Sequence, residues 1–204
     1  MITLHTYGDS HATHFGGWDG VTIDTIRIST NHLIGKLAYS FGRDKIQVVK
    51  GVNENDIILF CFGEIDCRCH INKYEPDWKL SIDNLIDTYF DTIKLNVSKF
   101  KNLKTCVYNV VPPLERENPL NLWTEVWANN HGVPATGSDE ERKKYTEYMN
   151  NKLSEKCIEF GYTFFDVYSE YSDENGFLKR ELSDTNCHIK DPTYIKEFII
   201  KNLI

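Results

Sequence analysis

The sequence predicts an α/β protein whose parallel sheet is covered by helices on both faces. Two observations support this fold class: short apolar runs rich in Val, Ile and Phe recur along the chain, and segments with helical periodicity lie between them. Such alternation is typical of a parallel sheet, because each crossover helix packs back onto the sheet. No repeat or change of composition divides the chain, so we expect one domain over residues 1–204.

Strands and helices are predicted in alternation from the N-terminus onward. The apolar runs predict strands at residues 2–6, 23–28, 56–62, 105–111 and 162–167. Helices are predicted at residues 35–41, 82–100, 139–160 and 192–203. The second of these has an apolar stripe with a period of 3.6 residues. The third follows Ser138, a good N-cap, and has acidic residues in its first turn.

Composition and charge exclude several classes of protein. Hydrophobic residues make up 41% of the chain and charged residues 26%, as in ordinary globular domains. The net charge of -7 opposes binding to nucleic acid or anionic lipid, and no Lys/Arg-rich stripe reverses it locally. With neither a signal-peptide pattern nor an apolar run of membrane-spanning length, we expect a cytoplasmic protein with no nucleic-acid or membrane partner. The six cysteines are accordingly expected to be reduced thiols.

Residues 112–137 combine Pro, Asn and Gly with no sustained period, which predicts a long surface excursion. Trp123 and Trp127 lie within it. They are expected either to stack on a sugar ring or to pack beneath the loop.

A candidate nucleophile follows the first predicted strand. The tetrapeptide Gly8-Asp9-Ser10-His11 places Ser10 at the carboxyl end of that strand, where open α/β sheets bind their ligands. A serine in such a turn is also a common helix N-cap, so the tetrapeptide alone leaves both roles open. His11 and His14 are expected either to line the site or to lie on the surface.

Three further blocks of polar residues follow in order. Gly35 begins a predicted helix, where its N–H group can point at a developing negative charge. Gly63-Glu64-Ile65-Asp66-Cys67-Arg68 follows the third predicted strand, and Ser183-Asp184-Thr185-Asn186-Cys187-His188 precedes the last predicted helix. A histidine with a nearby aspartate at this edge of the sheet suits a general base with its orienting acid.

Together the four blocks resemble those of the SGNH (GDSL-like) hydrolase family, over nearly the whole chain. The resemblance implies a three-layer α/β/α fold with a five-stranded parallel sheet. It also implies esterase, lipase or carbohydrate-deacetylase activity with no metal or cofactor. By position it assigns Ser10 as the nucleophile, His188 as the general base and Asp184 as the acid that orients it. The N–H groups of Ser10 and Gly35 are the implied oxyanion donors.

One departure from the family pattern concerns the oxyanion. The third block of the family is usually Gly-x-Asn-Asp, and its Asn side chain donates to the oxyanion, but this chain has Ile65 there, which cannot donate. Losing such a donor costs about 2.7–4 kcal/mol of transition-state stabilisation, so we expect either a replacement donor or a slow enzyme. Arg68 either replaces it or pairs with Glu64 or Asp66, and His70 is the alternative donor.

A second departure concerns spacing. The family commonly places Asp three residues before His, whereas Asp184 lies four residues before His188. We expect a one-residue bulge to bring the carboxylate to the imidazole.

A zinc site is the rival interpretation of the cysteines and histidines. Its candidate ligands are Cys67, Cys69, His70, Cys187 and His188. The Cys-x-Cys spacing argues against it, because structural zinc sites favour Cys-x2–4-Cys pairs. We therefore expect no metal.

The expected reaction is acyl transfer through Ser10. His188 takes the hydroxyl proton as the oxygen attacks an acyl carbonyl, and water or another hydroxyl then resolves the acyl-serine. The expected substrate is a small acyl ester, such as an acetyl ester of a carbohydrate, by analogy with polysaccharide-modifying members of the family. Two alternatives remain open: a glycan O-acyltransferase that uses the same residues, and a non-catalytic module that binds a glycan or a partner protein.

Overall fold

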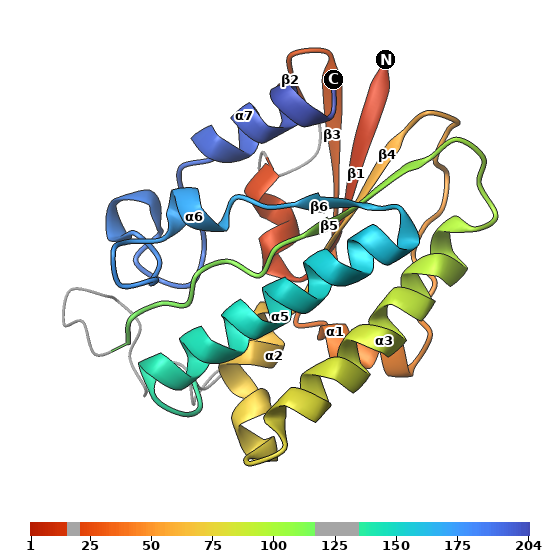
Figure 1. The fold of residues 1–204 in the computed structure, drawn as a ribbon. Coiled ribbons are helices and arrows are strands. Elements are labelled where there is room, and N and C mark those ends of the chain that lie inside the picture. Colours follow the sequence, from red (N-terminus) through yellow and green to blue (C-terminus); the bar gives the residue numbers. More distant parts are fainter. Residues whose placement is uncertain (16–20, 117–134) are drawn as a thin grey trace.

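A computed structural model describes residues 1–15, 21–116 and 135–204, and it has a central six-stranded sheet (Figure 1). The strands are β1 (Ile2–Gly8), β2 (Thr22–Ile23), β3 (Ile26–His32), β4 (Ile57–Cys61), β5 (Lys104–Tyr108) and β6 (Thr163–Phe165). Their order in the sheet is β2-β3-β1-β4-β5-β6. Five of them are parallel, and β2 pairs with β3 in the antiparallel sense. The predicted parallel sheet is thus confirmed, with a two-residue antiparallel strand added at one edge.

Helices cover both faces of this sheet. The α-helices are α1 (Ala38–Arg43), α2 (Glu64–Cys69), α3 (Trp78–Val97), α5 (Asp139–Phe160), α6 (Tyr168–Tyr171) and α7 (Thr193–Asn202). Short 3-10 helices occur at η1 (Ser10–Phe15), η2 (Ile71–Tyr74) and η3 (Arg180–Leu182). In Figure 1, α1, α3 and α5 lie on one side of the sheet and α7 on the other.

The central strand β4 shows why two helical layers are needed. All five of its side chains are buried. Because side chains alternate across a strand, Ile58 and Phe60 join the core beneath α3 and α5, whereas Ile57 and Leu59 join the core beneath α7. A strand that is apolar on both faces is stable only between two layers, which is the three-layer arrangement that the sequence predicts.

Two predicted elements differ from the structure, and one helix was not predicted. The strand predicted at residues 23–28 is divided by a turn in which Asp24 has a φ of 51°, so β2 folds back on β3 as a hairpin. The helix predicted from Gly35 begins at Ala38 instead, because Gly35 lies in a turn with a φ of 63°. The helix α2 was not predicted, since its six residues are too few for a period to show.

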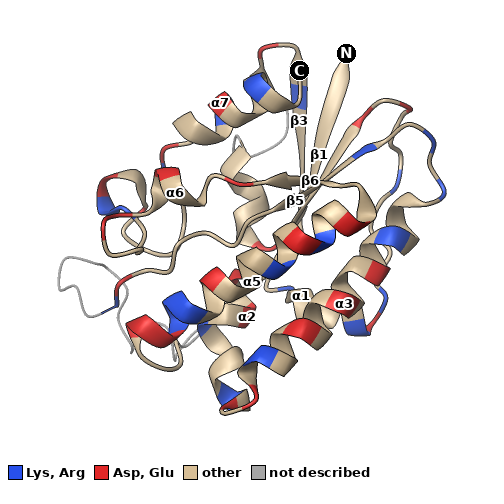
Figure 2. Ribbon diagram, viewed as in Figure 1, with Lys and Arg blue, Asp and Glu red and all other residues tan. Residues whose placement is uncertain are grey.

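The long helices agree better with prediction. The bounds of α5 match the predicted ones, and Ser138 forms a capping box with Glu141 at its start. Charges of both signs are interspersed along α3 and α5 and form no basic stripe there (Figure 2). No helix among the described residues combines the length and apolar character needed to cross a membrane.

Candidate active site

The site begins where β1 reaches the carboxyl edge of the sheet. Gly8, the last residue of β1, pairs with His32 of β3 and with Cys61 of β4. Its backbone lies so close to β4 that a Cβ atom would stand 2.0 Å from the carbonyl oxygen of Cys61, so only glycine fits. The chain then turns into η1, and Ser10 is the first residue of that helix.

Ser10 is linked to His188 and Asp184 by two hydrogen bonds. The Oγ of Ser10 lies 2.8 Å from Nε2 of His188, although the two residues are 178 positions apart. On the other side of the ring, Nδ1 of His188 lies 2.9 Å from Oδ2 of Asp184. Because a carboxylate only accepts, Nδ1 carries the proton and Nε2 is left to accept from the serine hydroxyl. The structure thus brings these three predicted residues together as nucleophile, base and orienting acid require.

The expected contact between the Asp184 carboxylate and the His188 imidazole is made despite the extra residue between them. Thr185 has a φ of 65°, a left-handed conformation that shortens the path of the chain. The other oxygen of Asp184 accepts from the backbone N–H groups of Asn186, at 2.8 Å, and His188, at 3.2 Å. These bonds hold the carboxylate beside the imidazole even though the spacing departs from the family pattern.

Asp184 and His188 shift each other's pKa toward the ion pair. Burial lowers the pKa of His188, but the hydrogen bond with Asp184 and the neighbouring Cys187 sulfur outweigh this effect and raise it above the usual value. Burial raises the pKa of Asp184, but the contact with His188 and two backbone N–H groups lower it overall. Both side chains remain about one third exposed, at 32% for His188 and 36% for Asp184. The imidazole is therefore accessible from one side.

Two histidines of η1 hold the loop that carries His188. Nδ1 of His11 lies 2.8 Å from Oδ1 of Asp9, and its Nε2 lies 3.1 Å from the carbonyl oxygen of Cys187. His14 accepts at Nε2 from the N–H group of Ile189, at 3.2 Å. Burial, followed by the nearby His11 and His188, lowers the pKa of His14 well below its usual value, so this ring is neutral. Both rings are buried, so the surface alternative for them was wrong.

The backbone supplies two candidate oxyanion donors. Among the described residues, the N–H groups of Ser10 and Gly35 have no hydrogen-bond acceptor. Gly35 lies three residues beyond the end of β3, at the same sheet edge as Ser10, because His32 pairs with Gly8. Ile65 is buried in the first turn of α2 and offers no side-chain donor there.

Arg68 forms an ion pair with Glu64, which is one of the two roles considered for it. Its Nε lies 2.5 Å from Oε1 and its Nη2 lies 3.0 Å from Oε2 of that carboxylate. Burial raises the pKa of Glu64, but Arg68, followed by the more distant His11 and His188, lowers it overall. Two nitrogens of the guanidinium are thereby committed to Glu64, which leaves less of the group available to an oxyanion.

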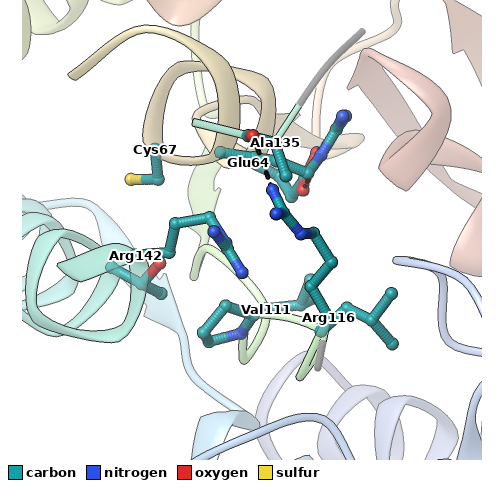
Figure 3. A pocket seen from close by; sticks show the side chains of 10 residues that line it. Glu64, Cys67, Val111, Arg116, Ala135 and Arg142 are labelled. Atoms are coloured by element: carbon teal, nitrogen blue, oxygen red, sulfur yellow. Dashed lines mark hydrogen bonds and ion pairs between the residues drawn. The ribbon is translucent and has the colours of Figure 1, made fainter. Parts of the chain in front are cut away.

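The cavity beside this pair is small. It has a volume of about 20 Å³, and Arg116 and Arg142 line it together with Arg68 (Figure 3). Arg116 donates to the carbonyl oxygen of Ala135, and Arg142 pairs with Asp139. This space holds about one water molecule and excludes an acyl group.

His70, the alternative donor, lies in a different place. It lines a larger cavity of about 740 Å³ between α1 and α3, which is not lined by Ser10, Asp184 or His188. Its Nδ1 accepts from Nζ of Lys73 at 3.1 Å. The larger cavity is therefore not the place where Ser10 lies.

The sequence prediction overlooked the role of Asp66. Its carboxylate accepts from the N–H groups of Ala38, at 2.8 Å, and Tyr39, at 3.1 Å, and so caps the start of α1. Complete burial raises its pKa to about 7. The position was visible in the third block, but its partner was not, because no local pattern indicates which helix a distant carboxylate caps.

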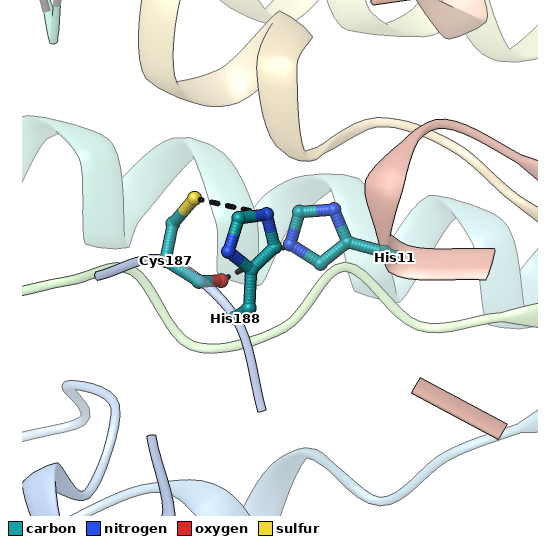
Figure 4. Close-up of side chains that lie close together, drawn as sticks. All are labelled: His11, Cys187 and His188. Atoms are coloured by element: carbon teal, nitrogen blue, oxygen red, sulfur yellow. Dashed lines mark hydrogen bonds between the residues drawn. The ribbon is translucent and has the colours of Figure 1, made fainter. Parts of the chain in front are cut away.

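The five candidate ligands of the rival zinc site do not come together in the described part of the chain. All six cysteines are free thiols, as predicted. Cys67 contacts the sulfur of Met149 at 3.4 Å in the core. In the described part of the chain, the one group of three possible ligands that come together is His11, Cys187 and His188 (Figure 4). Trp123 and Trp127 lie outside the described residues.

Comparisons with known proteins agree with the fold. Neither a protein-family model nor a curated protein matches the sequence. A Streptococcus pneumonia protein described as a candidate platelet activating factor is 15% identical, with a TM-score of 0.66, over 99% of this chain and 83% of that one. A GDSL-like lipase from Bacteroides thetaiotaomicron is 12% identical, with a TM-score of 0.59, over 98% and 86%. An aryl esterase of M. smegmatis is 13% identical, with a TM-score of 0.52, over 98% and 99%. The chain therefore has the α/β/α fold of the SGNH/GDSL-like hydrolases.

Proposed function

We propose that this protein is a serine ester hydrolase with Ser10 as nucleophile. The observation that carries the proposal is the chain of hydrogen bonds from Ser10 through His188 to Asp184. A serine hydroxyl is a weak nucleophile unless a base takes its proton, and here Nε2 of His188 is positioned to do so. The lipase and esterase named among the structural matches support the same class of reaction.

In the first half-reaction Oγ of Ser10 attacks the acyl carbonyl while His188 takes the proton. The imidazolium that forms is stabilised by Asp184, and the oxyanion accepts from the N–H groups of Ser10 and Gly35. His188 then returns the proton to the leaving alcohol, which departs and leaves acyl-Ser10. In the second half-reaction His188 takes a proton from water, the hydroxyl oxygen attacks the acyl carbon, and Ser10 is regenerated with the carboxylic acid as product.

For the substrate we favour a small acyl group, such as acetyl, on a carbohydrate hydroxyl. In the described part of the chain, the cavities of about 740, 370 and 320 Å³ are lined by neither Ser10 nor His188. One third of the His188 side chain is exposed, which leaves room for an acceptor on the open side. The six free thiols suit a reducing compartment, and we place the protein in the cytoplasm.

Two measurements test the proposal. A fluorophosphonate probe should label the purified protein at Ser10, since covalent labelling requires an activated serine. With a panel of acetylated sugars and p-nitrophenyl esters, the rate of hydrolysis should then fall in proportion to the fraction of Ser10 that the probe has labelled. In the variant Ser10→Ala both signals should disappear.

The matched control is Ser169→Ala, which removes an exposed hydroxyl of α6 that donates to Glu170. This variant should be labelled and should hydrolyse esters as the wild type does. Absence of labelling in a folded wild-type protein would refute the proposal and favour a non-catalytic binding module. Transfer of the acyl group to an added sugar, in preference to water, would show the acyltransferase instead.

A further inference from the structure

Two imidazoles and a thiol converge beside Ser10. The rings of His11 and His188 have centroids 5.3 Å apart, and the Cys187 sulfur lies 3.8 Å from Nε2 of His188. One ligand atom from each of the three residues lies within 4.8 Å of the other two. In Figure 4 the sulfur and the imidazole of His11 lie on either side of the His188 ring.

Each imidazole is oriented by a carboxylate on the far side of its ring. Nδ1 of His11 is held by Asp9 at 2.8 Å, and Nδ1 of His188 is held by Asp184 at 2.9 Å. Histidines that bind metals almost always donate their other N–H group to a carboxylate, a carbonyl or water, which fixes the tautomer and makes the free nitrogen a better ligand. Here a carboxylate orients each ring; Nε2 of His188 lies 3.8 Å from the thiol, and Nε2 of His11 faces the carbonyl oxygen of the same cysteine residue at 3.1 Å.

The ligand set has a definite chemical preference. Two imidazole nitrogens and one thiolate suit zinc, and they are poor ligands for magnesium or calcium, which prefer oxygen. Tetrahedral zinc, with bonds of about 2.0–2.3 Å, places its ligand atoms roughly 3.5 Å apart. The separation of 3.8 Å between the Cys187 sulfur and the His188 nitrogen is already close to this value, and the His11 ligand atom, which lies within 4.8 Å of both, must move closer for the set to be complete.

We propose that His11, Cys187 and His188 form a zinc site that switches off the serine. On binding, the Cys187 thiol and Nε2–H of His11 release protons to solvent, and zinc exchanges water ligands for the three side chains. His11 keeps its bond to Asp9 and gives up its bond to the Cys187 carbonyl. The lone pair on Nε2 of His188 is then bound to the metal, so Ser10 has no base.

The inhibitory part of this proposal rests on the proposed hydrolase function, whereas metal binding does not. Binding is therefore measured first, with Co²⁺ in place of Zn²⁺, because a cobalt–thiolate bond gives a charge-transfer absorption band. We expect one Co²⁺ per chain with this band in the wild type and in Ser10→Ala. Ser10→Ala should bind at least as tightly, since the hydroxyl no longer competes for Nε2.

Two variants locate the ligands. Cys187→Ala should abolish the band and raise the Kd for Zn²⁺ by about 100-fold or more, while Cys157→Ala, which removes a buried thiol of α5, should change neither. Melting temperatures show whether each variant is folded. If Cys187→Ala is unfolded, His11→Gln serves instead and should weaken binding by at least about tenfold while the thiolate band persists at saturating metal.

Inhibition is then measured with the ester that the wild type hydrolyses best. Stoichiometric Zn²⁺ should abolish hydrolysis by the wild type and by Cys157→Ala, and EDTA should restore it. Absence of the band in the folded wild type, or its persistence in folded Cys187→Ala, would overturn the site. Cobalt binding by a protein that hydrolyses no ester would leave the site in place and refute the hydrolase function instead.

Discussion

Replacing Arg68 by alanine tests whether this residue stabilises the fold or the oxyanion. Arg68 and Glu64 form a bidentate pair in which the two side chains are only 11% and 8% exposed. Removing one partner of such a pair leaves a buried charge without its counterion, which costs about 3–5 kcal/mol. For a domain of this size each kcal/mol lowers the Tm by about 2–4 °C, so Arg68→Ala should lower it by roughly 6–20 °C.

The assay measures stability and single-turnover rate on the same preparation of Arg68→Ala. Because the predicted effect is structural, the rate of acyl-enzyme formation per folded molecule should fall by less than about tenfold. The matched control is the double variant Glu64→Leu with Arg68→Met, which removes both charges and keeps their volume. It should be more stable than Arg68→Ala, since replacing a buried pair by apolar side chains is often neutral.

The opposite pattern would refute this reasoning. If Arg68 donates to the oxyanion, Arg68→Ala should lower kcat by about 100-fold or more with little change in KM or in Tm. The oxyanion forms only in the transition state, so its donors affect kcat more than substrate binding. Partial recovery of kcat by Ile65→Asn in the Arg68→Ala background would strengthen that outcome.

Three further predictions concern pH and local strain. His188 must be neutral to act as a base, and its pKa is raised, so kcat/KM measured in the presence of EDTA should rise with pH through an inflection above 6.5. Asp184→Asn should move this inflection to lower pH. An unchanged inflection would contradict the pairing of Asp184 with His188. The pKa of Asp66 is about 7 in the folded state against 3.8 for the free group, so its contribution to stability is complete below pH 3.8 and is lost as the pH rises to about 7. Urea denaturation should therefore show a smaller loss of stability between about pH 4 and pH 7 for Asp66→Asn than for the wild type, and parallel curves would show that the buried acid does not titrate there. Thr185 has a left-handed φ, which costs about 1–2 kcal/mol for a residue with a side chain. Thr185→Gly relieves this strain, but the flexibility of glycine in the unfolded chain offsets part of the gain, so the Tm should rise by about 2–4 °C. A lower Tm would mean that the hydrogen bond from the Thr185 hydroxyl to the Asp184 carbonyl contributes more than the strain costs.

The alternation of strands with helices and the layering of helices on both faces follow from the sequence because both depend on patterns of side-chain polarity. The five apolar runs each overlap an observed strand, and the stripe along α3 gives the face that it buries. Short elements were less predictable. The turn at Asp24 and the start of α1 depend on single backbone conformations, and a left-handed residue leaves little signal in a pattern of hydrophobicity.

The residues of the candidate site also differ in how well the sequence predicted them. Ser10, Asp184 and His188 were predicted from the order of the blocks together with their resemblance to the SGNH hydrolase family. The ion pair of Arg68 remained one of two alternatives, because a spacing of four residues permits it only if the segment is helical. That segment, α2, was too short to be predicted.

The nucleophile and its base are positioned by one short helix, which explains how a contact across 178 residues is kept at hydrogen-bond distance. Ser10 begins η1, and His11 and His14 of the same helix bind the backbone on either side of His188, at Cys187 and at Ile189. Each bond contributes about 1 kcal/mol, and His11 is itself fixed by Asp9. Because both anchors and the nucleophile lie on η1, a displacement of that helix moves Ser10 together with the loop of His188. The distance between Oγ and Nε2 is therefore set within a compact unit rather than by the packing of the whole domain.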